Sequence, residues 1–115
     1  MEFTPFENSL IRWYVDHAPH EEFKNQLQSC APSDRSYSGA GLFVELSIQP
    51  GSWSKIPDEV KSPVSGPNIS SPSLKNGAGS ILFLKDGLVD MLEVYTFDDE
   101  MSEDLAEYDI GIELE

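Results

Sequence analysis

Two apolar segments joined by the dipeptide Asp86-Gly87 restrict the fold of this chain more than any other feature. Ser80–Leu84 is an apolar run, and Leu88–Phe97 is apolar on both faces apart from three polar positions. An Asp-Gly pair between apolar segments favours a two-residue hairpin turn, because both residues tolerate the positive φ angles that the turn requires. We therefore predict an antiparallel hairpin, and its two apolar faces place it at the centre of a sheet.

Two further segments alternate with the period of two that is typical of strands. In Ala40–Gln49, one face carries apolar side chains and the other is mixed, which predicts a half-buried strand. Tyr108–Leu114 alternates apolar residues with polar or glycine residues, so we expect a final strand that closes the sheet. Between the hairpin and this strand, Ser102–Asp104 is a cap signal for one helical turn.

The N-terminal region carries a helix start signal. Thr4 precedes Pro5 and is followed three residues later by Glu7, which is the pattern of a capping box with proline at the first helical position. We expect this helix to end at Asp16 or His17, because a proline follows shortly afterwards.

A second short helix is predicted after it, with Phe23 and Leu27 as its buried pair. Residues 50–76 then hold five prolines among many serines and glycines, which predicts a long loop without helix or sheet ladder. Trp53 and Ile56 are candidates to pin that loop to the body.

The expected fold class is α+β: an N-terminal helix or helix pair packed on a mainly antiparallel sheet of about four strands, within one domain of residues 1–115.

One short motif occurs twice: Gly39-Ala40-Gly41 and Gly77-Ala78-Gly79 each lead into a predicted strand. The glycines are expected to adopt positive φ or to allow close approach of another backbone. A phosphate-binding loop is the alternative, but neither copy precedes a helix or has the spacing of a nucleotide-binding loop.

Charge is distributed unevenly along the chain. The net charge is −14, and residues 86–115 hold twelve acidic side chains with no lysine or arginine. Such a field repels nucleic acid and anionic membranes and accelerates encounter with a basic protein. The alternative is a solvated face that only promotes solubility.

No apolar run is long enough to span a membrane, the first residues lack a secretory signal, and Cys30 is the sole cysteine, so the expected location is cytoplasmic.

Four residue groups are candidates for chemistry. Cys30 has His17 and His20 upstream as possible bases, but no neighbour that would lower the pKa of its thiol. The same histidines precede two glutamates, yet the proline between them disrupts a metal-binding helix face. The acidic residues after Phe97 lack the spacing and central glycine of a calcium loop. We therefore predict neither a metal nor a cofactor.

The fourth group consists of Glu45, Asp90 and Glu93, which interrupt predicted strands. Paired carboxylates can perform acid and base catalysis, so a small enzyme with a pocket covered by the proline-rich loop is one hypothesis. The alternative is a sheet face that meets solvent or a partner. A structural or regulatory subunit, whose charge serves solubility alone, is a further hypothesis.

The segment Gly77–Leu88, continued by Leu92–Tyr95 and Asp98–Met101, resembles the short acidic immunity proteins that are encoded beside bacterial polymorphic toxins, including those of contact-dependent growth inhibition. The resemblance covers about 25 of the 115 residues. It implies sequestration of a cognate toxin domain inside the producing cell, and it implies no particular binding residues.

We accordingly expect a non-enzymatic immunity protein, monomeric or weakly dimeric, that neutralises a basic toxin domain such as a nuclease and does not bind nucleic acid or membrane itself. The predicted contact surface combines carboxylates with apolar anchors, as interfaces do. Its residues are Asp90, Glu93, Phe97, Asp98, Asp99, Glu100, Met101, Glu103, Asp104 and Glu107.

Overall fold

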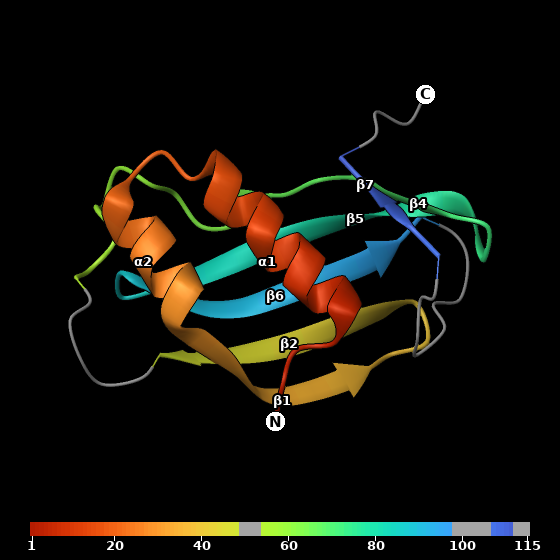
Figure 1. Cartoon of the computed structure of the whole chain (residues 1–115), viewed down its shortest axis with the longest axis horizontal. Helices are drawn as coiled ribbons and strands as arrows, with labels where there is room; N and C mark the ends of the chain where they lie inside the picture. Colours follow the sequence, from red (N-terminus) through yellow and green to blue (C-terminus); the bar gives the residue numbers. More distant parts are fainter. Residues whose placement is uncertain (49–53, 98–106, 112–115) are drawn as a thin grey trace.

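Two helices lie on one face of an antiparallel sheet. The computed structural model describes residues 1–48, 54–97 and 107–111. The helices are α1 (Pro5–His17) and α2 (Glu21–Ser29), and Figure 1 shows both on the same side of the strands. The strands are β1 (Cys30–Tyr37), β2 (Gly41–Ile48), β3 (Val64–Ser65), β4 (Ile69–Ser71), β5 (Leu74–Lys85), β6 (Leu88–Thr96) and β7 (Asp109–Ile110). The predicted α+β class, with helices packed on a mainly antiparallel sheet, is confirmed.

The sheet order is β1-β2-β6-β5-β4-β7, and β3 pairs with β5 outside this path. The predicted hairpin is therefore central, because β6 and β5 have neighbours on both sides. Its turn is Asp86-Gly87, with φ angles of 54° and 77°. Both angles are positive, as the tightest hairpin turns require.

The predicted start of α1 is also confirmed. The side chain of Thr4 accepts a hydrogen bond from the Glu7 amide at 3.1 Å, and the Glu7 carboxylate accepts one from the Thr4 amide at 3.0 Å. These two bonds satisfy amide groups that have no partner within the helix. The second helix and the strand predicted at Ala40–Gln49 are present as α2 and β2.

The number of strands was predicted wrongly: the described residues form seven, not about four. Two of the missed strands, β3 and β4, and the first residues of β5 lie within the predicted loop at 50–76. The described prolines of residues 50–76 fall between short paired segments rather than within them, so these prolines do not interrupt the hydrogen bonding between strands. Ile56 does pin this region, since it is 3% exposed, whereas Trp53 lies outside the described residues.

The third missed strand is β1, which follows α2 directly. It pairs along its length with β2, with a register shift between Pro32 and Asp34. The strand forms one edge of the sheet, where a proline and an irregularity are tolerated because no further ladder follows. At the other edge, β7 lies within the predicted final strand and pairs with β4, and Ile112–Leu114 of that prediction lie outside the described residues. The predicted helical turn at Ser102–Asp104 lies outside the described residues.

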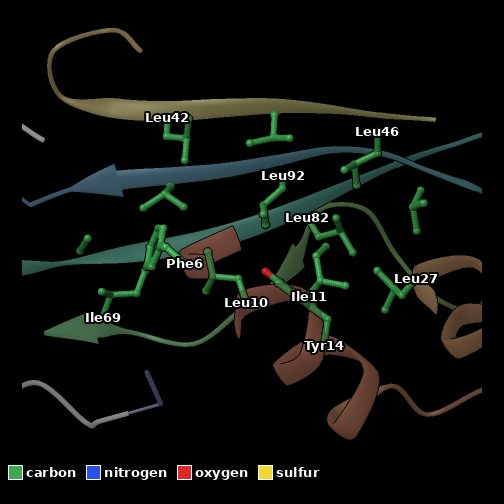
Figure 2. Packing of buried hydrophobic residues seen from close by; sticks show 14 of the residues in the cluster. Phe6, Leu10, Ile11, Tyr14, Leu27, Leu42, Leu46, Ile69, Leu82 and Leu92 are labelled. Carbon is green, nitrogen blue, oxygen red and sulfur yellow. The ribbon is translucent and has the colours of Figure 1, made fainter. Parts of the chain in front are cut away.

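The core lies between the helices and the inner face of the sheet (Figure 2). From α1, Leu10 and Tyr14 point toward the strands, and α2 adds Leu27. The sheet contributes Leu82 and Leu92, which are opposite each other in the register and 0% exposed. One buried cluster thus joins both helices to β2, β5 and β6.

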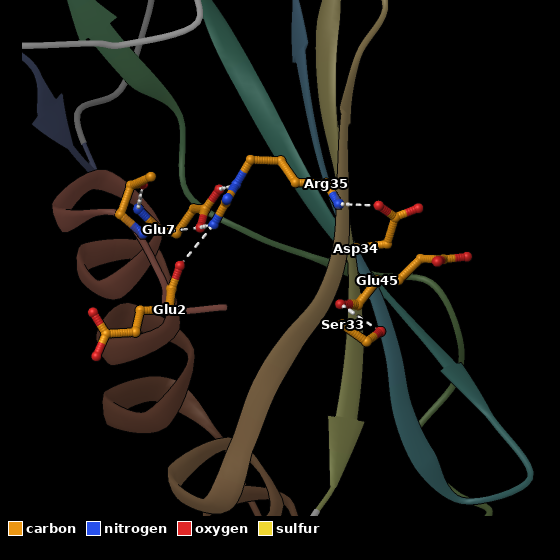
Figure 3. A network of polar contacts seen from close by, with 7 residues as sticks. Glu2, Glu7, Ser33, Asp34, Arg35 and Glu45 are labelled. Carbon is orange, nitrogen blue, oxygen red and sulfur yellow. Dashed lines mark hydrogen bonds and ion pairs between the residues drawn. The ribbon is translucent and has the colours of Figure 1, made fainter.

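A buried ion pair fastens α1 to the edge strand β1. Glu7 is 0% exposed and accepts hydrogen bonds from Nε and Nη2 of Arg35 at 2.6 and 2.5 Å (Figure 3). Nη2 also donates to the main-chain oxygen of Glu2. The hydrogen bonds that Arg35 donates to the Glu7 carboxylate raise the pKa of Arg35. The carboxylate of Glu7 therefore caps α1 and also binds α1 to the edge strand β1.

Gln26 performs a similar role at the opposite end of the sheet. Its Nε2 donates to the carbonyl oxygens of Ser54 and Gly87, both at 2.8 Å, and its Oε1 accepts the amide of Val89 at 2.9 Å. The side chain is 0% exposed and both ends of its amide are bonded. It thereby ties α2 to the hairpin turn and to the loop that begins at Ser54.

We expect the central hairpin to dominate stability. Leu82→Ala and Leu92→Ala should each lower the free energy of unfolding by about 2 to 5 kcal/mol, because each removes a fully buried side chain and leaves a cavity. Urea denaturation measures the change. Leu88→Ala, at a half-exposed position of the same hairpin, is the control and should cost clearly less. Near-neutral values for Leu82 and Leu92 would show that the hairpin is peripheral.

We expect Glu7→Gln to destabilise the fold by about 2 to 4 kcal/mol, because Arg35 then loses the carboxylate that neutralises it in a largely buried place. Glu2→Gln is the matched control, since Arg35 contacts only the main-chain oxygen of Glu2. The double change Glu7→Gln/Arg35→Met should lie closer to the parent than Glu7→Gln alone. A neutral Glu7→Gln result in chemical denaturation would refute this role of the pair.

Candidate protein-binding face

The face of the sheet opposite the helices carries the candidate site, which we call the open face. It is formed by the outward side chains of β2, β6 and β5, which alternate with the buried ones. The register places them in three rows across the strands, followed by Phe97 just beyond β6. The rows are Glu45, Met91 and Phe83; Phe43, Glu93 and Ile81; and Gly41, Tyr95 and Gly79.

Two aromatic side chains stand out on this face. Three large apolar side chains are exposed in the described part of the chain, and two of them are Tyr95 at 36% and Phe97 at 47%. Their rings meet edge to face, with centroids 6.0 Å apart and an interplanar angle of 65°. We call these two residues the aromatic pair. Exposed aromatic groups of this kind are typical of protein interfaces.

The repeated Gly-Ala-Gly motif surrounds Tyr95. Gly41 and Gly79 are its neighbours on the two adjacent strands. A Cβ atom on Gly79 would lie 2.5 Å from Oη of Tyr95, and a Cβ atom on Gly41 would lie 2.5 Å from the carbonyl oxygen of Val94. The predicted close approach of another backbone is thus confirmed at Gly41, whereas the close neighbour of Gly79 is a side chain.

The first glycine of each motif has the predicted positive φ: 81° at Gly39 and 80° at Gly77. Main-chain oxygens at these two glycine motifs accept hydrogen bonds from the end of β6, one motif on each side of the strand. The oxygen of Ala40 accepts the amide and the hydroxyl of Thr96, and the oxygen of Gly77 accepts the amide of Phe97. The backbone that carries the aromatic pair is therefore anchored to β2 and β5.

The open face is acidic. The carboxylates of Glu45 and Glu93 form no ion pair within the described residues, and Figure 3 shows Asp34 and Glu45 on the side of the strands away from α1. The seven basic side chains lie elsewhere or at the margins. Arg35 turns to Glu7, Lys75 and Lys85 lie near the ends of β5, and Arg12, Lys24, Lys55 and Lys61 belong to the helices and to the loop before β3.

The predicted contact residues fall in different places. Glu93 and Phe97 lie on the open face, with Tyr95 between them. Asp90 is exposed at a register shift near the start of β6, and Glu107 lies near β4, where its main-chain oxygen accepts the Ser71 hydroxyl. The other six lie outside the described residues: Asp98, Asp99, Glu100, Met101, Glu103 and Asp104.

Sequence reasoning missed the apolar part of this face. Tyr95, Phe43 and Met91 were not among the predicted contacts, although Met91, Glu93 and Tyr95 alternate with the buried residues Leu92 and Val94. This alternation was a usable signal, but apolar residues on both faces of β6 concealed which face is covered by the helices.

The thiol and metal candidates are not assembled into a site. Burial raises the pKa of Cys30 to about 11, and its Sγ donates to the oxygen of Leu27, so the thiol is protonated at neutral pH. His17 stacks on Trp13, and His20 contacts Glu59 at 3.0 Å. In the described ranges, no three His, Cys, Asp or Glu side chains gather in a cluster that could hold a metal ion.

The strand carboxylates do not line the pocket beside the described part of the proline-rich region. The loop after Ser54 meets the hairpin turn through the hydrogen bond from Ile56 to Gly87, and a cavity of about 160 Å³ lies there. Its lining includes Asp58 and Asp86 but not Glu45, Asp90 or Glu93. A larger hollow of about 450 Å³ lies on the helix side, between α1 and Tyr108–Ile110.

No protein-family model, curated protein or solved structure matches the chain. Neither helix in the described part of the chain is long and apolar enough to cross a membrane.

Two glycine substitutions should distinguish a glycine beside a partly exposed side chain of the open face from a glycine beside a buried core side chain. Gly79→Ala should displace the Tyr95 ring at a cost below about 1 kcal/mol, because that ring is partly exposed and can turn aside. Gly66→Ala should cost at least about 2 kcal/mol, because its Cβ would collide with Oη of the buried Tyr14. Denaturation and the ring resonances of Tyr95 measure both effects. Equal losses of stability would mean that Tyr95 is fixed as firmly as the core.

Proposed function

We propose that this chain is an immunity-type binding protein that neutralises a basic toxin domain through its open face. The observation that carries the proposal is the combination of Glu45 and Glu93, which form no ion pair within the described residues, with exposed Tyr95 and Phe97 on the sheet face opposite α1 and α2. Interfaces that bind tightly combine apolar anchors with charges that complement the partner. The partial resemblance to acidic immunity proteins of polymorphic toxin systems supports the same function.

The two components of the face have separate physical roles. The net charge of −14 attracts a cationic surface over distances comparable to the screening length and therefore raises the association rate. The apolar and aromatic side chains exclude water after contact and therefore slow dissociation. A nuclease toxin is a suitable partner, because it needs a cationic surface to bind phosphates and an acidic protein can occupy that surface.

Charge removal on the open face should slow association. We expect Glu45→Gln/Glu93→Gln to lower the association rate several-fold at low salt and to lose part of the salt dependence. For the parent, raising the ionic strength from low to moderate should slow association by about tenfold. Glu21→Gln, an exposed carboxylate on α2, is the matched control. Stopped-flow or surface-based kinetics give the rates, and an association rate indifferent to salt would contradict the electrostatic part of the proposal.

The proposal itself is tested with the protein encoded beside this chain in its native host. Expression of that neighbour alone should arrest growth, and co-expression of this chain should restore growth and yield a complex by size-exclusion chromatography. The double variant Glu45→Gln/Glu93→Gln should protect less than Glu21→Gln at equal expression. A neighbour that is not toxic, or protection that is the same in both variants, would reject the proposed function of the open face.

A further inference from the structure

The end of β6 presents a carboxylate and two aromatic rings in a row. Glu93, Tyr95 and Phe97 alternate with inward-facing residues, so their side chains emerge on the same face about 7 Å apart along the strand. The two rings meet edge to face, which leaves ring surface in contact with solvent at both residues. Glu93 is half-buried and lies between Phe43 and Ile81 in the register, so apolar residues flank it on both adjacent strands.

This row is held in place by backbone contacts rather than by other side chains. Thr96 bonds to Ala40 on one side, and Phe97 bonds to Gly77 on the other. The glycines at positions 41 and 79 leave no side chain beside Tyr95 on either adjacent strand. The backbone that carries the aromatic pair is thus fixed, while the rings remain partly exposed, so no backbone order has to be gained when a ligand binds to them.

We infer that Glu93, Tyr95 and Phe97 form a receptor for one arginine side chain of the partner. The guanidinium group lies against the aromatic pair and donates hydrogen bonds to the Glu93 carboxylate. This inference rests on the proposed function and names the group that the open face recognises. Charge complementarity selects a cation, because the three rows of the open face contain two carboxylates and no basic residue.

Arginine fits the row better than lysine does. Its guanidinium is planar and weakly hydrated, so it can stack on a ring while its N–H groups remain free for a carboxylate in the same plane. The ammonium of lysine is compact and strongly hydrated, and it cannot stack. A neutral planar analogue such as citrulline keeps the shape but loses the charge, so it separates stacking from cation recognition.

The test uses the full chain and three small probes: the N-acetyl amides of arginine, lysine and citrulline. Chemical shifts of the Tyr95 and Phe97 rings and of the Glu93 side chain are followed by NMR during titration. We expect saturable shifts with the arginine probe, binding at least about threefold weaker with lysine, and no saturation with citrulline. Equal binding of arginine and citrulline, or shifts that map to other residues, would overturn the inference.

Variants identify the contributing groups. Glu93→Gln, Tyr95→Leu and Phe97→Leu should each weaken binding of the arginine probe by at least about threefold, because each removes the charge or a π-face. Phe83→Leu is the aromatic control, since Phe83 lies on the same face two rows away, and Glu21→Gln is the carboxylate control. Thermal melting verifies that every variant is folded. Unchanged affinity in both Tyr95→Leu and Phe97→Leu would refute the receptor.

Failure of this inference differs from failure of the proposed function. If Glu45→Gln/Glu93→Gln weakens toxin binding while Tyr95→Leu and Phe97→Leu do not, the open face binds the toxin but the arginine receptor is rejected. If the arginine probe binds as expected while none of the variants affects toxin binding, the receptor stands and the proposed function is rejected.

Discussion

The whole arrangement depends on the burial of one face of the sheet by two short helices. Leu10, Tyr14 and Leu27 cover the inner side chains of β2, β5 and β6, and the described chain has no other helix. The opposite face therefore remains outside the core, although it carries Phe43, Phe83 and the aromatic pair. Antiparallel sheets often expose one face to water, but such faces are usually polar. Apolar residues beside unpaired carboxylates are better explained by a partner than by solvent.

Polar contacts within the fold support this division into two faces. Glu7 joins the first turn of α1 to Arg35 of the edge strand, and Gln26 joins α2 to the hairpin turn at the other end of the sheet. Both side chains are 0% exposed and fully engaged, so each helix is held over the inner face near one end. The open face is consequently a rigid surface whose backbone is fixed by the same strands that form the core. A fixed backbone favours binding, because little backbone conformational entropy is lost when a complex forms.

Local signals in the sequence were sufficient for part of the fold. Thr4 and Glu7 predicted the helix start, and Asp86-Gly87 predicted the central turn, because each pattern acts within four residues. Strand β1 was not predictable, since its polar sequence contains Pro32 and its order depends on pairing with β2 and on Arg35 reaching Glu7, 28 residues away. The open face was only partly predictable for the same reason. Glu93 and Phe97 were among the predicted contact residues and lie on this face, but the position of Tyr95 between Gly41 and Gly79 depends on a register that no local pattern reveals.

We expect the proposed partner to bind to the open face rather than to the helices. Hydroxyl-radical footprinting tests this expectation, because it reports the solvent accessibility of individual side chains in the free protein and in the complex with the proposed toxin partner. The expected result is strong protection of Met91, Tyr95 and Phe97 in the complex and unchanged oxidation of Trp13, which lines the hollow on the helix side. Protection of Trp13 with unchanged oxidation of Tyr95 and Phe97 would contradict it.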